Sequence, residues 1–143
     1  MRAAARGRTE RRSPSGALLE GCYTRGSDTR WLQFASINFD ASVLEIFNPL
    51  THSSHLVIVP GEVRANPEAM HDFLRAELIT HAFLPPAVLR LLPRRPIEGM
   101  NTIMCGGKAS DDTVRFWSYV LRLSNIYGST EATVLATENT FGA

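Results

Sequence analysis

The 143-residue chain has few of the features that mark disulfide scaffolds, membrane proteins or strongly charged binding proteins. Its two cysteines, Cys22 and Cys105, lie far apart. They argue against a disulfide framework or a zinc site and fit a reducing, cytoplasmic compartment. No apolar run approaches the ~20 residues of a membrane span. The apolar content of 44% and net charge of +1 predict a globular domain with its own core.

Excess positive charge is confined to the first residues. Residues 1–30 hold seven arginines against three acidic residues, and the opening stretch MRAAARGRTERRSPSG has no apolar periodicity. We therefore predict a disordered Arg-rich arm over residues 1–25 and a folded part over 26–143. A solvated tail, an organelle transit peptide and a nucleic-acid-binding arm remain open. The lack of interleaved aromatic residues disfavours nucleic acid, and no apolar stretch follows that would make a secretory signal.

From Trp31 onward, strand-like and helix-like segments alternate. The pattern predicts strands over 31–36, 55–60, 80–85, 101–107, 122–128 and 133–137, with helices over 42–50, 67–78, 86–93 and 111–121. Strands that alternate with helices form βαβ units, so we expect an α/β fold with a mostly parallel sheet. The apolar run HLVIVP is typical of a strand buried on both faces.

Local signals mark where the helices begin and which side chains they bury. Ser42 and Glu45 have the spacing of a capping box, Asn66 and Pro67 suit the N-cap and first position of a helix, and Ser110 suits an N-cap. Apolar side chains then follow at helical spacing. These are Val43, Ile46, Phe47 and Leu50 in the first helix, Met70, Phe73, Leu74 and Leu78 in the second, and Val114, Trp117 and Leu121 in the last.

Ligands of parallel α/β sheets bind at the carboxyl ends of the strands. That edge is predicted to carry residues 36–40, 83–86, 104–108 and 125–131. The last range, NIYGSTE, suits a tight turn around a glycine. It also suits a nucleotide site, because an aromatic face stacks on a base and a carboxylate binds Mg²⁺. The residues alone leave both interpretations open.

Two further groups of residues have chemistry that a site uses. His52 and His55 have a spacing compatible with a metal, but no third ligand accompanies them, so a loop is favoured. Cys105 lies in an apolar strand, which favours packing over a nucleophilic role.

Four motifs occur in an order that resembles a known family. LQFASINFDAS, LPPAVL, CGGKAS and NIYGSTE are similar to motifs of the adenylation domains of nonribosomal peptide synthetases, which belong to the AMP-dependent synthetase and ligase superfamily. The resemblance covers about residues 30–140. It implies activation of an amino acid with ATP and Mg²⁺, followed by transfer of the acyl group to the phosphopantetheine thiol of a peptidyl carrier protein.

The resemblance also implies a nucleotide site. Tyr127 would stack on adenine, Asn125 would hold the adenine edge, Thr130 would lie near the α-phosphate, and Glu131 would coordinate Mg²⁺. The glycines would let the backbone approach the base closely. They are Gly106, Gly107 and Gly128.

Asp40 matches the family's aspartate that pairs with the α-ammonium of the substrate, a pairing that offsets the desolvation of the cation. Without the resemblance, Asp40 would be interpreted as a helix cap, although Ser42 offers a competing cap. Further positions are similar to the lining of the side-chain pocket, and all are apolar or glycine, which implies an apolar amino acid. They are Ala41, Leu44, Phe83, Met104, Gly106, Ile126, Val134 and Leu135.

Several parts that the family's chemistry needs are not found in this sequence. They are a Gly/Ser/Thr-rich phosphate loop, the aspartate that binds the ribose, and the catalytic lysine of the small C-terminal domain. We therefore expect an internal fragment that is inactive alone. A fragment of an enzyme and a non-catalytic remnant with at most nucleotide-binding ability both remain open.

Overall fold

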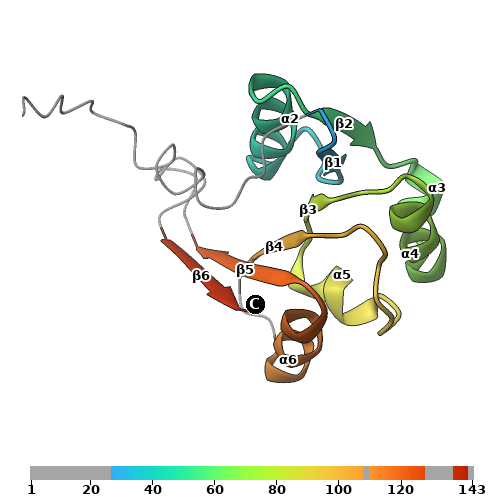
Figure 1. Cartoon of the computed structure of the whole chain (residues 1–143), viewed down its shortest axis with the longest axis vertical. Coiled ribbons are helices and arrows are strands. Elements are labelled where there is room, and N and C mark those ends of the chain that lie inside the picture. Colours follow the sequence, from blue (N-terminus) through green and yellow to red (C-terminus); the bar gives the residue numbers. More distant parts are fainter. Residues whose placement is uncertain (1–26, 108–109, 128–136, 142–143) are drawn as a thin grey trace, which may run out of the picture.

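A computed structural model describes residues 27–107, 110–127 and 137–141. Its strands form one six-stranded sheet in the order β2-β1-β3-β4-β5-β6 (Figure 1). The first five strands are parallel and β6 is antiparallel to β5, which confirms the predicted α/β fold with a mostly parallel sheet. The strands are β1 (Arg30–Gln33), β2 (His55–Ile58), β3 (His81–Phe83), β4 (Thr102–Gly106), β5 (Arg122–Tyr127) and β6 (Thr137–Phe141).

The connections between the parallel strands are largely helical. The helices are α2 (Ala41–Thr51), α3 (Gly61–Arg64), α4 (Pro67–Ala76), α5 (Pro86–Leu91) and α6 (Asp111–Val120). The chain runs from β1 outward to β2 and then returns to the other side of β1 to form β3. The direction of winding therefore reverses between β1 and β3, and at such a point the loops at the carboxyl ends of the strands diverge and leave a crevice.

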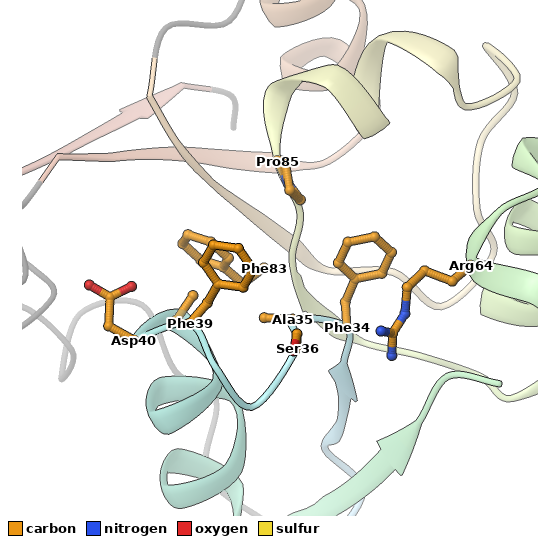
Figure 2. Close-up of a pocket in the computed structure, with 9 residues that line it drawn as sticks. Phe34, Ala35, Ser36, Phe39, Asp40, Arg64, Phe83 and Pro85 are labelled. Carbon is orange, nitrogen blue, oxygen red and sulfur yellow. The ribbon is translucent and has the colours of Figure 1, made fainter. Parts of the chain in front are cut away.

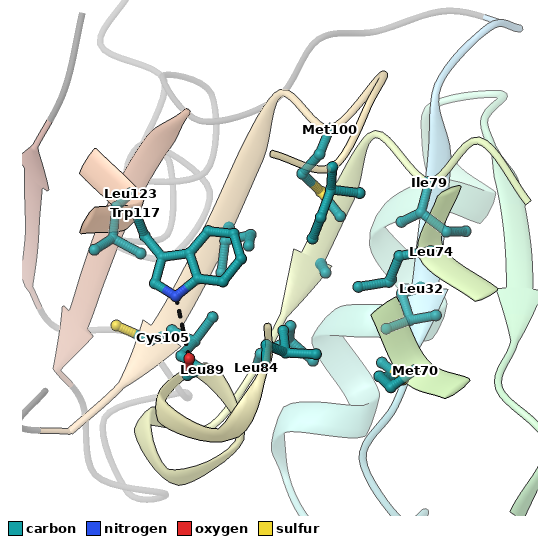
Figure 3. Packing of buried hydrophobic residues seen from close by; sticks show 14 of the residues in the cluster. Leu32, Met70, Leu74, Ile79, Leu84, Leu89, Met100, Cys105, Trp117 and Leu123 are labelled. Atoms are coloured by element: carbon teal, nitrogen blue, oxygen red, sulfur yellow. Dashed lines mark hydrogen bonds between the residues drawn. The ribbon is translucent and has the colours of Figure 1, made fainter. Parts of the chain in front are cut away.

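Alternation of side chains along the strands gives the sheet two buried faces. On one face Leu32, Ile103 and Leu123 pack against α4, α5 and α6, and the indole Nε1 of Trp117 donates a 3.1 Å hydrogen bond to the carbonyl of Leu89 (Figure 3). The opposite face forms a smaller cluster that includes Leu44 of α2. Its other buried members are Trp31, Met104 and Ile126.

The prediction that residues 55–60 form a strand buried on both faces is wrong. β2 is an edge strand, because the chain turns back after it and adds β3 on the far side of β1. His55 is exposed and Ile58 is 67% exposed, whereas Val59, just past the strand, is 2% exposed. An apolar run alone does not distinguish a central strand from an edge strand.

The start of α4 agrees with the sequence. The side chain of Asn66 accepts hydrogen bonds from the backbone N–H groups of Glu68 and Ala69, and Pro67 occupies the first turn. Met70 and Leu74 are buried as predicted. Leu78 is not, because α4 ends at Ala76 and Leu78 has a φ of 50° outside the helix.

The predicted capping box of α2 is wrong. The helix begins at Ala41 after Asp40, Ser42 Oγ donates to the carbonyl of Phe39, and Glu45 accepts hydrogen bonds from the loop that follows β1. The predicted apolar side chains of this helix lie largely on its outer face. Val43, Phe47 and Leu50 are 51%, 60% and 60% exposed.

The last two predicted elements differ in detail from the structure. Ser110 occupies the N-cap position of α6, but its Oγ lies 2.9 Å from Thr113 Oγ1 and makes no cap hydrogen bond. Trp117 is buried as expected, with Val114 and Leu121 partly buried against the same cluster. Of the predicted strand 133–137, residues 133–136 lie outside the described part, and the observed strand β6 begins at Thr137.

Candidate functional site

A cavity of about 400 Å³ lies at the carboxyl ends of β1 and β3, where the winding reverses. Its wall comes from the loop between β1 and α2 (residues 34–40), the first residue of α2, the end of α3 and the end of β3 (Figure 2). Most lining side chains are apolar. The lining residues are Phe34, Ala35, Ser36, Phe39, Asp40, Ala41, Arg64, Phe83 and Pro85.

Asp40 and Arg64 are the charged residues of this lining, and Figure 2 shows them at opposite ends of the labelled residues. Asp40 occupies the N-cap position of α2 but makes no side-chain cap hydrogen bond. The capping interpretation of Asp40 therefore has no hydrogen bond to support it. The guanidinium of Arg64 lies 5.4 Å above the centre of the Phe34 ring, an attractive cation–π arrangement.

The predicted substrate-binding positions divide into two sets around Phe83. Asp40, Ala41 and Phe83 line the cavity, whereas Leu44, Met104 and Ile126 lie in the buried cluster that Phe83 packs against. Gly106 joins the two sets, because a Cβ atom at this position would lie 3.0 Å from Cζ of Phe83. The Phe83 side chain thus contacts the cavity on one side and the cluster of Leu44, Met104 and Ile126 on the other.

The predicted nucleotide-binding residues are described only in part. β4 and β5 bring Gly106 opposite Ile126 and Cys105 opposite Asn125, so these positions share the carboxyl edge of the sheet. Gly107 has a φ of 97°, a conformation that favours glycine, with no atom within 4 Å of where a Cβ would lie. Tyr127 ends β5. Gly128, Thr130, Glu131, Val134 and Leu135 lie outside the described residues.

Glu45 is a candidate site residue that the sequence interpretation assigned to a helix cap. Its side chain is fully buried, and Oε2 accepts hydrogen bonds from Phe34 N at 3.0 Å and Ala35 N at 2.9 Å. Burial raises the pKa of this carboxyl from 4.5 to about 7, against the lowering effect of the two amides and of Arg64. The sequence signal that could have indicated a buried carboxylate was the position of Glu45 between the apolar residues Leu44 and Ile46.

Cys105 and His52 both have neighbours that favour a structural role. Cys105 is buried, its Sγ lies 3.8 Å from Asn125 Oδ1, and burial raises the pKa of its thiol to about 11. A thiol with so high a pKa is a poor nucleophile at neutral pH. His52 Nδ1 lies 2.8 Å from the carbonyl oxygen of Asn48 at the end of α2. Within the described residues, no group of three or more His, Cys, Asp or Glu side chains forms a metal site.

The fold is similar to that of larger proteins of known structure. The Vibrio cholerae adenylation domain AlmE, solved with glycyl-adenosine-5'-phosphate, is 24% identical and matches with a TM-score of 0.73 over 82% of this chain and 23% of its own. The structure of IdnL7 is 23% identical and matches with a TM-score of 0.77 over 87% of this chain and 27% of its own. At this identity the likeness concerns the fold.

The sequence comparisons identify the family. The model for AMP-binding enzymes matches residues 13–142. The chondramide synthase of Chondromyces crocatus is 42% identical over 85% of this chain, and bacitracin synthase 3 of Bacillus licheniformis is 42% identical over 76%. The chain belongs to the AMP-binding enzyme family, as a fragment of an adenylation domain of the nonribosomal peptide synthetase type. It spans 3% and 2% of the length of these two relatives.

Membrane association through a spanning helix has no support in the described part of the chain, where every helix is too short or too polar to cross a bilayer.

Proposed function

We propose that this chain supplies the amino-acid-binding wall of an adenylation domain that activates an apolar amino acid. The observation that carries the proposal is the cavity between β1 and β3, which has an apolar lining and the carboxylate-bearing residue Asp40 at one end. A carboxylate beside an apolar cavity selects a ligand that combines an ammonium group with an apolar body.

In the proposed reaction the carboxylate of the amino acid attacks the α-phosphate of ATP, giving an aminoacyl adenylate and pyrophosphate. The phosphopantetheine thiol of a peptidyl carrier protein then attacks the acyl carbon, which forms a thioester and releases AMP. In this scheme Asp40 binds the α-ammonium and so fixes the position of the substrate carboxylate. Correct positioning of two reactants is itself a large part of such a rate enhancement.

The preference for an apolar side chain follows from the described pocket positions. Of the residues that line the cavity, Phe34, Phe39 and Phe83 offer no hydrogen-bonding group to a polar or charged substrate side chain, which would be buried without a partner. Arg64 is the other charged residue at the cavity, and the negative charge of Glu45 interacts with it. Arg64 is therefore less available to neutralise an acidic substrate than an isolated guanidinium would be.

The nucleotide assignment rests on fewer described residues. The space beside Gly107, where nothing lies within 4 Å of a Cβ position, leaves room for a purine. Asn125, near the same end of β5, carries an amide whose donor and acceptor suit the polar edge of adenine. Stacking by Tyr127, contacts of Gly128 and Thr130 with the nucleotide, and Mg²⁺ binding by Glu131 complete the proposal. Val134 and Leu135 would add to the apolar lining, and a cytoplasmic location fits these substrates.

An isolated 143-residue chain should not catalyse amino-acid-dependent pyrophosphate exchange. Its sequence shows no Gly/Ser/Thr-rich loop to bind the β- and γ-phosphates, and such electrostatic contacts are often the largest contribution to the rate. The alternative proposal is a non-catalytic remnant. It shares this expectation but predicts that the segment does not support pyrophosphate exchange even when it is placed in a complete domain.

A graft distinguishes the two proposals. Residues 30–140 replace the corresponding segment of a complete adenylation domain of known activity, and pyrophosphate exchange is measured with leucine, phenylalanine, aspartate and lysine. We expect exchange with the apolar amino acids and little with the charged ones. A folded graft that is inactive with all amino acids supports the remnant, and a preference for aspartate or lysine contradicts the apolar assignment.

A further inference from the structure

The loop between β1 and α2 (residues 34–40) forms most of one wall of the cavity, yet it contains little regular structure. Its first two backbone N–H groups, those of Phe34 and Ala35, both point at Oε2 of Glu45, at 3.0 and 2.9 Å. Gln33 Nε2 lies 3.4 Å from the same oxygen. One buried carboxylate oxygen therefore receives three donors from the strand end and the loop.

We propose that Glu45 is a positioning residue that holds the wall of the amino-acid cavity in place through its carboxylate. The inference deepens the proposed function, since it rests on the cavity being the amino-acid site. Glu45 lies four residues after Ala41 in the same rigid helix, so its hydrogen bonds connect the start of the loop to the helix that carries Ala41 and Leu44. Phe34 and Ala35 are thereby held in place relative to Ala41, which lines the same cavity.

The carboxyl group performs this role in both protonation states. Oε1 of Glu45 is buried without a hydrogen-bond partner among the described residues, so a proton on Oε1 leaves Oε2 to accept both amides. Loss of that proton makes the two hydrogen bonds charge-assisted and stronger, at the cost of a buried charge. The strength of the wall contacts should therefore change with pH, and the midpoint should be that of Glu45, about 7.

The surroundings of Glu45 fit this assignment. Helix α2 packs against β1, β2 and β3, whose titratable and charged side chains are Arg30, His55 and His81. Arg30 is paired with Glu77 at 2.9 Å, and burial lowers the pKa of His81 to about 4, so that it is neutral near pH 7. Arg64 of α3 is the described group whose positive charge lowers the pKa of Glu45.

Nuclear magnetic resonance of the full chain tests the inference without relying on catalysis. The amide shifts of Phe34 and Ala35 are followed from pH 5 to pH 9 alongside the side-chain carboxyl carbon of Glu45. We expect all three signals to titrate with one midpoint near pH 7. The titration of the amides should disappear in Glu45→Gln and persist in Glu62→Gln, a control at an exposed position of α3.

Hydrogen exchange gives a second measurement in the same samples. Removal of the acceptor in Glu45→Ala should speed exchange of the Phe34 and Ala35 amides about tenfold or more, whereas Glu45→Gln, which keeps an acceptor oxygen, should stay within about threefold. The inference would be overturned if the amide shifts of Phe34 and Ala35 did not change as Glu45 titrates in wild type. It would also be overturned if the two amides exchanged at the wild-type rate in a folded Glu45→Ala chain. If Glu45→Ala does not fold, the wild-type and Glu45→Gln titrations decide.

Binding of L-phenylalanine to the full chain separates this inference from the proposed function. We expect Glu45→Ala to weaken that binding and Glu45→Gln to retain it. If wild type shows no binding while the two amides still titrate with Glu45, the proposed substrate fails and the positioning role stands.

Discussion

Two fully or nearly fully buried side chains, Glu45 and His81, have pKa values displaced in opposite directions. Burial raises the pKa of Glu45 from 4.5 to about 7, and burial together with the charge of Arg122 lowers the pKa of His81 from 6.5 to about 4. Each pKa difference corresponds to a change of about 3 kcal/mol in the free energy of unfolding between the pH at which the group is protonated and the pH at which it is deprotonated. The folded chain thus favours the neutral form of both groups.

The two groups should give opposite pH dependences of stability. A raised pKa at Glu45 means that its contribution is full below pH 4.5 and is lost as the pH rises to 7. The lowered pKa of His81 means that its contribution is full above pH 6.5 and is lost as the pH falls to 4. Between pH 4.5 and 6.5 the two slopes nearly cancel in wild type.

Glu45→Gln should expose the contribution of His81. Its free energy of unfolding should rise by about 2 kcal/mol from pH 4.5 to 6.5, while wild type and the control Glu62→Gln stay nearly flat in urea denaturation. The same flat profile in Glu45→Gln and wild type would show that Glu45 does not titrate with folding.

Gly106 lies against the Cζ end of the Phe83 ring, which makes the pair sensitive to a single methyl group. Gly106→Ala places a Cβ 3.0 Å from Phe83 Cζ, so the ring must move, and we expect a loss of about 1 kcal/mol or more. Phe83→Leu should remove most of that cost, which a double-mutant cycle by urea denaturation measures. Additive effects of the two substitutions would show that they do not share this contact.

At the scale of elements, the sequence pattern predicted the first five strands and helices α2, α4, α5 and α6 in their order, but not the short helix α3. The prediction of α4 is confirmed because its start is fixed by local residues: Asn66 caps the helix and Pro67 occupies its first position. The sequence pattern failed at β2, because burial of a strand depends on its place in the sheet and not on its own residues. It failed for Glu45, because the partners of that carboxylate, Phe34 and Ala35, come from another element.

Sequence predicted those site residues that lie in loops at the carboxyl ends of the strands. The rule for parallel sheets located Asp40 and Phe83 near one cavity without knowledge of any contact. The contact between the end of the Phe83 ring and Gly106 was not predictable, because the orientation of a ring depends on packing across two strands. Arg64 was missed for the same reason, since α3 reaches the cavity only in the folded chain.

Helix α2 presents an apolar face that the described residues leave exposed. Val43, Phe47 and Leu50 gather on it, and Phe47→Glu should therefore reduce self-association of the chain in sedimentation velocity. Leu91→Glu is a matched control, because Leu91 of α5 is also 60% exposed but lies outside this face. Equal effects of the two substitutions, or a wild-type chain that stays monomeric, would contradict the prediction.

At the scale of the whole molecule, the described chain is a segment of a larger domain type, with the edge strand β2 and the outer face of α2 both open. We propose that residues 26–143 hold all of the folded part and that residues 1–25 are a separate Arg-rich arm. The cavity between β1 and β3 would then keep its walls within one contiguous segment, which is why a graft of residues 30–140 is a fair test of its chemistry.

The pairing of Asp40 with the substrate ammonium is tested most directly by comparing leucine with 4-methylpentanoate, which lacks the amino group. In the grafted domain, wild type should use leucine far better than the des-amino acid, and Asp40→Asn should lose activity with leucine and most of that discrimination. Asp111→Asn, at an exposed position in the first turn of α6, serves as the control and should behave as wild type. Undiminished preference for leucine in Asp40→Asn would contradict the assignment of Asp40 and with it the proposed site.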